Sequence, residues 1–154
     1  MIRRTVVIGV GNPYRRDDGV GPAVAAAVTV PPDVAVLTCP AEPTAILDAW
    51  DGAALAVLVD AAVGVPPGLV SAGRLDEVAV PENPVSSHDL SLRQTWELGC
   101  VLGRAPGSLV VVTVGIADAG HGVGLSPAVR AALPEAVRTV ERIVAEQIHE
   151  SVDQ

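Results

Sequence analysis

The sequence predicts an α/β fold, a three-layer α/β/α sandwich around a mixed, mainly parallel sheet of about five strands. Short apolar runs alternate with helix-type patterns along the 154 residues, as in chains built from strand–helix–strand units. The runs at 55–59 and 109–116 are continuously apolar, which is typical of strands buried on both faces. Hydrophobic residues reach 49% without any Phe. Val, Ala and Leu must therefore fill the core of what we expect to be one domain, 1–154.

The first half of the chain divides at its prolines and glycines. An Ala-rich segment after Gly19 predicts a helix that Pro31 and Pro32 bring to an end. Pro43 begins the next helix, because a missing N–H costs little in a first turn. We expect strands at 5–10, 34–38 and 55–59 and helices at 21–28 and 42–50.

The second half adds two strands and two helices. Segment 69–75 predicts an added strand for which an antiparallel orientation stays open, and 80–87 is expected to be a loop. Ser87 is a good N-cap for a helix over 87–103, with a buried stripe at Leu92, Trp96 and Cys100. The strand at 109–116 leads into a Gly-rich loop at 117–125. The last helix begins at Ser126 and Pro127, and we expect Pro134 to kink or restart it. Its apolar face comprises Leu133, Val137, Val140, Val144 and Ile148.

Composition excludes several classes of function. The net charge is −8, whereas a nucleic-acid binder needs a basic patch for phosphate contacts. No apolar run approaches the roughly 20 residues that a membrane span needs. Cys39 and Cys100 lack metal-type spacing and are expected to be reduced, structural thiols. Met1 to Arg4 precede the first strand without a signal-peptide pattern, so we expect a cytoplasmic protein.

Candidate catalytic or metal-binding groups follow the predicted strands. Asp17 and Asp18 come after the first strand, Asp60 ends the third, and His88 begins a helix. The carboxyl ends of parallel strands meet at one edge of a sheet. Two carboxylates and an imidazole there could hold a divalent metal such as nickel or zinc. Structural alternatives stay open: Asp18 could cap a helix, Asp60 could end a strand, and His88 could be exposed.

Two common motifs are absent. Gly9 and Gly11 suggest a dinucleotide-binding turn, but Tyr14 occupies the place of its third glycine. The nucleophile elbow of serine hydrolases is missing as well. His121, between two glycines, is expected to be a loop residue, and His149 to be solvated.

Four collinear segments resemble the [NiFe]-hydrogenase maturation endopeptidases. They are Gly9-Val10-Gly11-Asn12 with Asp17-Asp18-Gly19-Val20-Gly21, then Val59-Asp60-Ala61, Ser87-His88-Asp89-Leu90 with Leu92, and Gly124-Leu125-Ser126-Pro127-Ala128-Val129. The resemblance implies a phosphorylase/hydrolase-like fold. It also implies removal of a C-terminal extension from a nickel-loaded large-subunit precursor.

The resemblance assigns the contacts to nickel, and with them the catalytic site, to Asp18, Asp60 and His88. Many members of the family have Glu at the first position, so Asp18 is a shorter variant of that ligand. The nickel would be recognised in the substrate, and no tightly bound metal is required at rest. The family's Asp-Gly-Gly-Thr segment is replaced by residues 39–44; Glu42 and Thr44 are placed to take part of its role, which suggests a different hydrogenase subgroup.

Two other functions stay open. Peptidyl-tRNA hydrolase also begins with Gly-x-Gly-Asn-Pro and a nearby Tyr, but its general-base histidine is missing here, and the negative charge disfavours tRNA. A non-catalytic, metal-binding assembly chaperone would use the same three ligands and lack only the cleavage step.

Overall fold

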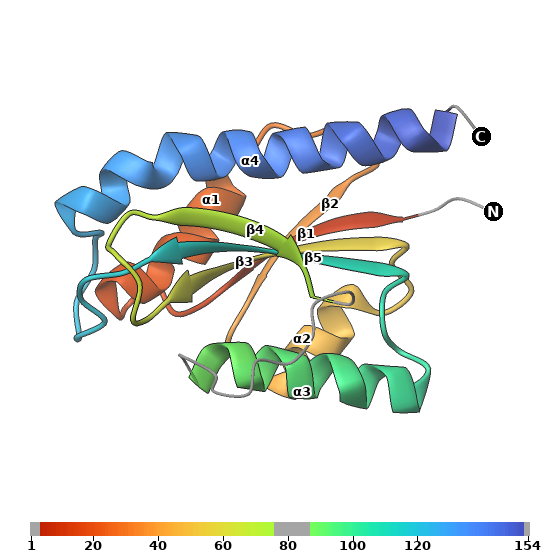
Figure 1. The fold of residues 1–154 in the computed structure, drawn as a ribbon, viewed down its shortest axis with the longest axis horizontal. Coiled ribbons are helices and arrows are strands. Elements are labelled where there is room, and N and C mark those ends of the chain that lie inside the picture. The colour runs from red at the N-terminus through yellow and green to blue at the C-terminus, as the bar shows by residue number, and fades with distance from the viewer. Residues whose placement is uncertain (1–3, 76–86, 153–154) are drawn as a thin grey trace.

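A five-stranded sheet lies between two layers of helices (Figure 1). The computed structural model describes residues 4–75 and 87–152, with only the backbone at 87–91 and 148–152. The strands are β1 (Thr5–Val10), β2 (Ala35–Cys39), β3 (Leu55–Ala62), β4 (Val70–Arg74) and β5 (Ser108–Gly115). The helices are the 3-10 turn η1 (Arg16–Gly19), α1 (Val20–Ala27), α2 (Pro43–Trp50), α3 (Ser87–Leu102) and α4 (Pro127–Val152).

The strand order is β2-β1-β3-β5-β4. The pairs β1–β2, β1–β3 and β3–β5 are parallel, whereas β4 lies antiparallel to β5 at one edge. The predicted α/β/α sandwich with a mixed, mainly parallel sheet of five strands is therefore confirmed. None of the described helices is long and apolar enough to cross a membrane.

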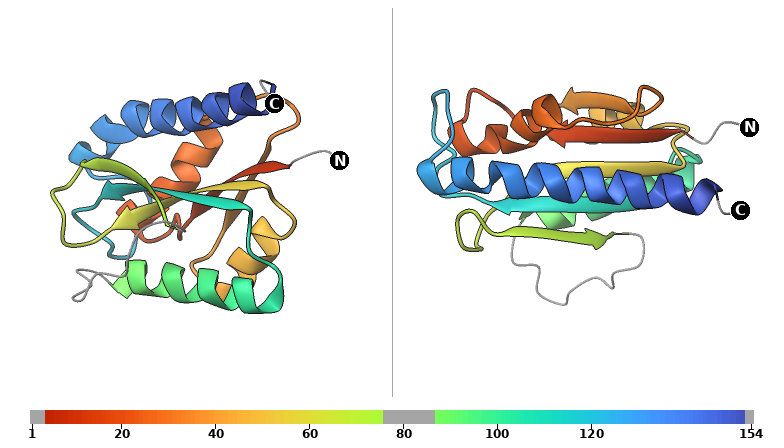
Figure 2. Two further views of the ribbon diagram at one scale, coloured as in Figure 1. Left: turned by 45° about the vertical axis from the view of Figure 1, so that its right-hand side comes forward. Right: turned by 90° about the horizontal axis from the view of Figure 1, so that it is seen from above.

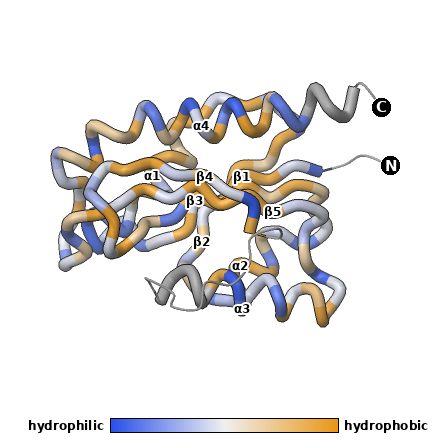
Figure 3. Tube along the Cα trace, in the orientation of Figure 1, coloured by the Kyte–Doolittle hydropathy of each residue, from blue (hydrophilic) through white to orange (hydrophobic). Residues whose placement is uncertain are grey.

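The core consists of two layers, one on each face of the sheet. Val7, Val57 and Val112 belong to the cluster beneath α1 and α4, and Val6 and Ile8 to the cluster above α2 and α3. This division follows from the alternation of side chains along a strand. In Figure 3, the coloured part of α4 likewise alternates between hydrophobic and hydrophilic residues. Val140 and Val144 of its predicted apolar face are buried.

Pro134, which was expected to kink or restart the last helix, does not restart it. The helix α4 runs unbroken from Pro127 to Val152 with Pro134 inside it. Pro134 is exposed, so water can hydrogen-bond the carbonyl that its missing N–H leaves without a partner.

The predicted buried stripe of α3 is wrong at Cys100. Leu92 and Thr95 are buried and Trp96 is half-buried, but Cys100 is exposed, and the buried residue at that level is Gly99. Each step of four residues turns about 40° beyond a full turn of an α-helix, so two such steps carry Cys100 away from the core. The loop expected at 80–87 lies outside the described residues except for Ser87, which begins α3.

Gly21 lets α1 lie directly against the backbone of two central strands. A Cβ there would lie 2.5 Å from the carbonyl oxygens of Val10 and Val59. Overpacking against backbone cannot be relieved by a side-chain rotation. Gly21→Ala should therefore lower the free energy of unfolding by about 2 kcal/mol, measured by urea denaturation. Gly73→Ala is the control, because a Cβ there meets nothing within 4 Å; equal losses in the two variants would contradict the packing argument.

Candidate functional site

The three elements that carry Asp18, Asp60 and His88 meet at the carboxyl edge of the sheet. Asp18 lies in η1, directly after β1, and Asp60 lies in β3. Figure 1 shows α3, whose first turn includes His88, starting on the side where β3 and β5 end. Asp60 does not end its strand as expected, because β3 continues to Ala62 and Asp60 pairs with Thr113 of β5.

The Asp60 side chain belongs to the α3 side of the sheet. Ala56 and Leu58 pack in the cluster above α2 and α3, and the side chain two residues farther along the strand points the same way. Asp60 is 2% exposed, and its Oδ1 accepts a hydrogen bond of 2.8 Å from the N–H of Ala61. A carboxylate is thus held in a nearly dry position on the face that α3 covers.

Asp18 does not cap a helix. The N-cap of α1 is Gly19, without a side-chain hydrogen bond. The half-buried Asp18 instead accepts a hydrogen bond of 2.9 Å at Oδ2 from the N–H of Asn12. This contact fixes the carboxylate within the loop that follows β1. Its other oxygen, Oδ1, makes no hydrogen bond to the part of the chain that the structure describes.

Asp17 has a structural role that the sequence analysis did not assign to it. Its Oδ2 accepts hydrogen bonds from the N–H groups of Ala117 (3.0 Å) and Asp118 (2.9 Å) and from Ser126 Oγ (2.7 Å), and its Oδ1 accepts one from Ser126 N–H (2.7 Å). Burial alone would raise the pKa of the Asp17 carboxyl, but these donors outweigh it, and the pKa is lowered. Asp17 therefore anchors the Gly-rich loop as an ionised group.

Backbone contacts strengthen the same connection between the two loops. The N–H of Arg16 donates to Gly122 O at 3.0 Å, and the N–H of Gly122 donates to Tyr14 O at 2.9 Å. Arg16 has a φ of 46°, a left-handed conformation that non-glycine residues rarely adopt. The turn that presents Asp18 is thus held from the far end of the sequence. No local sequence motif marks this pairing, which spans more than 100 residues.

Cys39 lies at the end of β2, close enough to Asp60 for the negative charge of that carboxylate to affect the Cys39 thiol. Burial and the negative charge of Asp60 raise the pKa of the Cys39 thiol to about 11. The thiol is therefore protonated at neutral pH and unsuited to act as a nucleophile. Cys39 and Cys100 are both free. The structural role expected for Cys39 fits this environment, whereas Cys100 is exposed.

The side chain of His88 lies outside the described residues, so only its place in the first turn of α3 is known. Among the described residues, no group of three His, Cys, Asp or Glu side chains could hold a metal ion. Asp18 and Asp60 lie at the carboxyl edge, and His88 lies in the first turn of the helix on the Asp60 side. Carboxylate and imidazole donors suit nickel. His121 is exposed in the Gly-rich loop, as expected.

The chain matches the model of a known protein family. A family model described as hydrogenase maturation protease matches residues 20–143, a span that includes Asp60 and His88. No curated protein sequence matches the chain.

Solved structures share the fold. One is the hydrogenase maturating endopeptidase HybD from E. coli, with 24% identity and a TM-score of 0.78 over 94% of this chain and 93% of that one. The hydrogenase maturation protease HybD from Thermococcus kodakarensis has 20% identity and a TM-score of 0.72 over 92% of this chain and 99% of that one. HycI from the same organism has 23% identity and a TM-score of 0.68 over 92% of each chain.

Proposed function

Because this chain belongs to the hydrogenase maturation protease family, we propose that it is an endopeptidase that removes the C-terminal extension of a nickel-loaded [NiFe]-hydrogenase large-subunit precursor. The observation that carries the proposal is that Asp18 and Asp60 both lie at the carboxyl edge of the sheet, on the side of the molecule where α3 starts. In an open parallel sheet this edge is where ligand sites form.

We assign the contacts to nickel to Asp18, Asp60 and His88. The metal arrives as part of the substrate, so the precursor supplies its remaining ligands and only a loaded precursor is held in a productive position. Peptide hydrolysis needs an activated water, and either a carboxylate of this site or the nickel of the substrate can activate it. The two free cysteines agree with action in the reducing cytoplasm, where we place the protein.

Mass spectrometry of the cognate precursor, incubated with this protein with and without nickel loading, tests the proposal. We expect the C-terminal peptide to be lost only from the nickel-loaded precursor, because only that form presents the metal to the three ligands. Cleavage without nickel would keep the protease and remove the role given to Asp18, Asp60 and His88. Binding without any mass change would favour the metal-binding chaperone.

A further inference from the structure

The outer edge of β2 carries open backbone hydrogen-bonding groups. Among the strands that the structure describes, β2 is the last in the sheet on its side and pairs only with β1. The C=O of Cys39 accepts a hydrogen bond of 3.1 Å from Gly11 N–H. Because both main-chain groups of a residue lie on the same side of a strand, Cys39 and Leu37 bond to β1. Val36 and Thr38 therefore direct N–H and C=O away from the sheet.

The chain is described on both sides of this edge. Residues 4–75 are described without a break, so the segments before and after β2 are both placed. None of the hydrogen bonds of these residues uses the outward groups of Val36 or Thr38. The open row is short, because Val34 N–H already donates to Pro31 O and Pro40 has no N–H. Seen from above in Figure 2, β2 (orange) lies at the margin opposite to β4 and outside the cover of α4.

The strand lacks the features that usually protect the edge of a sheet. Its sequence, Ala-Val-Leu-Thr-Cys, contains neither a charged residue nor a proline, whereas exposed edges commonly carry them. Val36 is 37% exposed and Leu37 is 38% exposed. Successive side chains of a strand point to opposite faces, so one apolar side chain is partly bare on each face of this edge. An extended apolar segment beside β2 would cover both.

The carboxyl end of this edge adjoins the candidate site. Gly11, which donates to Cys39, directly precedes Asn12, whose N–H holds the Asp18 carboxylate. The other carboxylate of the site is also near, because the charge of Asp60 contributes to the raised pKa of the Cys39 thiol. A strand added along β2 would therefore have one end beside residues that we assign to nickel.

The charge of this margin limits which segment can bind. Between Arg16 and Arg74 the sequence contains no basic residue. The exposed side chain of Glu42, three residues beyond β2, makes no hydrogen bond or ion pair to the described part of the chain. A bound segment should thus place a basic side chain near Glu42. A second copy of this chain fits less well, because its own β2 would bring no basic residue and another net charge of −8.

We propose that the outer edge of β2 binds an extended, apolar segment of the large-subunit precursor as an added strand, with a basic residue of that segment beside Glu42. Main-chain hydrogen bonds to Val36 and Thr38 supply affinity, and contacts with the side chains of Val36 and Leu37 supply specificity. The identity of the partner rests on the proposed function. The added strand holds the precursor next to the site without touching the metal.

Amide hydrogen exchange tests the added strand residue by residue. The isotope-labelled, unmodified chain is followed by NMR with and without nickel-free precursor. We expect exchange at Val36 and Thr38 to slow about tenfold or more, while Leu37 and Cys39, already bonded to β1, stay unchanged. Absence of this alternation in the complex would overturn the proposal. Protection that rises with protein concentration in the absence of precursor would overturn it too, in favour of a second copy of the chain.

A proline at position 38 tests the same edge through kinetics with nickel-loaded precursor. Thr38→Pro removes an outward N–H and is compatible with an edge strand, while Thr38→Val keeps that N–H. We expect KM to rise about tenfold in Thr38→Pro relative to Thr38→Val, with the same kcat in both. If Thr38→Pro fails to fold, the exchange measurement still decides, because it uses the unmodified chain.

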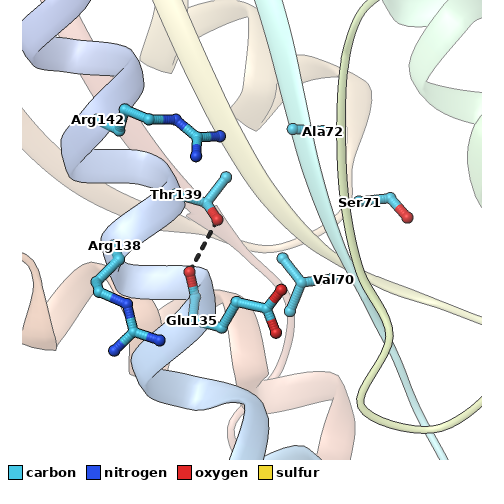
Figure 4. A pocket seen from close by; sticks show the side chains of 7 residues that line it. All are labelled: Val70, Ser71, Ala72, Glu135, Arg138, Thr139 and Arg142. Carbon is cyan, nitrogen blue, oxygen red and sulfur yellow. Dashed lines mark hydrogen bonds between the residues drawn. The ribbon is translucent and has the colours of Figure 1, made fainter.

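Charge reversal tests the contact with Glu42. Glu42→Arg should raise KM about tenfold, and Glu42→Asp, which keeps the charge, should restore most of the binding. The matched control is Glu135→Arg, the same change on the far side of the molecule. Figure 4 shows Glu135 on α4, where it lines a hollow of about 350 Å³ beside Val70 of β4. An equal rise of KM in Glu135→Arg would show that only the overall charge matters and would refute the contact.

The two proposals fail separately. If the wild-type chain cleaves the precursor and neither Thr38→Pro nor Glu42→Arg changes KM, the docking edge is wrong and the protease stands. If the wild-type chain does not cleave but the alternating protection appears, the docking edge stands and the protease is wrong.

Discussion

Asp60→Asn should lower kcat/KM for the nickel-loaded precursor by about 100-fold or more. The substitution keeps the size of the side chain. It also keeps an oxygen that can accept the hydrogen bond from Ala61 N–H, which is 2.8 Å long in the wild-type chain. It removes the negative charge that we assign to nickel contact, and losses of this size are typical when a charged group at a reacting centre is neutralised. The rate at which the C-terminal peptide appears in mass spectra measures the effect.

The matched control for this substitution is Asp33→Asn. Asp33 is exposed and precedes β2, at the edge opposite the candidate site, so the same chemical change should leave the rate unaltered. Asp18→Asn and His88→Ala should behave like Asp60→Asn, because the three side chains are proposed to act on one metal. Full processing by any of the three variants would refute its assignment as a ligand.

Asp17→Asn should destabilise the fold by about 3 kcal/mol at neutral pH. The carboxylate accepts four hydrogen bonds from Ala117, Asp118 and Ser126, and bonds to a buried charge are worth more than neutral ones. An Asn amide in the same place would turn an N–H₂ group toward a donor. Urea denaturation at pH 7 measures the loss. Ser126→Ala, which removes only the hydroxyl donor, should cost about 1 kcal/mol.

The difference in unfolding free energy between the wild-type chain and Asp17→Asn should decrease at low pH. The pKa of Asp17 is lowered in the folded state, so its stabilisation is fully present above the unfolded pKa of about 4. It is lost as the pH falls through the folded pKa. The difference in unfolding free energy should be constant from pH 5 to 8 and shrink below pH 4. A difference independent of pH down to 2 would show that the charge of Asp17 is unimportant.

The sequence predicts most of the fold because its signals are local. Continuous apolar runs mark β3 and β5, and Pro43 marks the start of α2 within one residue. The errors arise where a local rule was extended too far. A four-residue repeat drifts around a helix, so the expected stripe placed Cys100 wrongly. The exposed Pro134 does not restart the helix, because α4 continues through it.

The candidate site was likewise predicted from the sequence only in part. Asp18 and Asp60 can be recognised because they stand beside strands in short motifs, and the structure places both at the carboxyl edge. The role of Asp17 cannot be recognised locally, since its partners are backbone N–H groups of a loop near the other end of the chain. Any residue type offers such an N–H, so only the folded arrangement reveals the pairing.

The long span of the Asp17 contacts has a consequence for biosynthesis. Its hydrogen-bond partners follow it by 100, 101 and 109 residues, so a chain emerging from the ribosome lacks them until most of it has been made. Closing so long a loop is slow compared with forming a helix. The turn that carries Asp18 is therefore completed only after Ser126 has been synthesised, and a truncated nascent chain has no assembled site with which to engage a precursor.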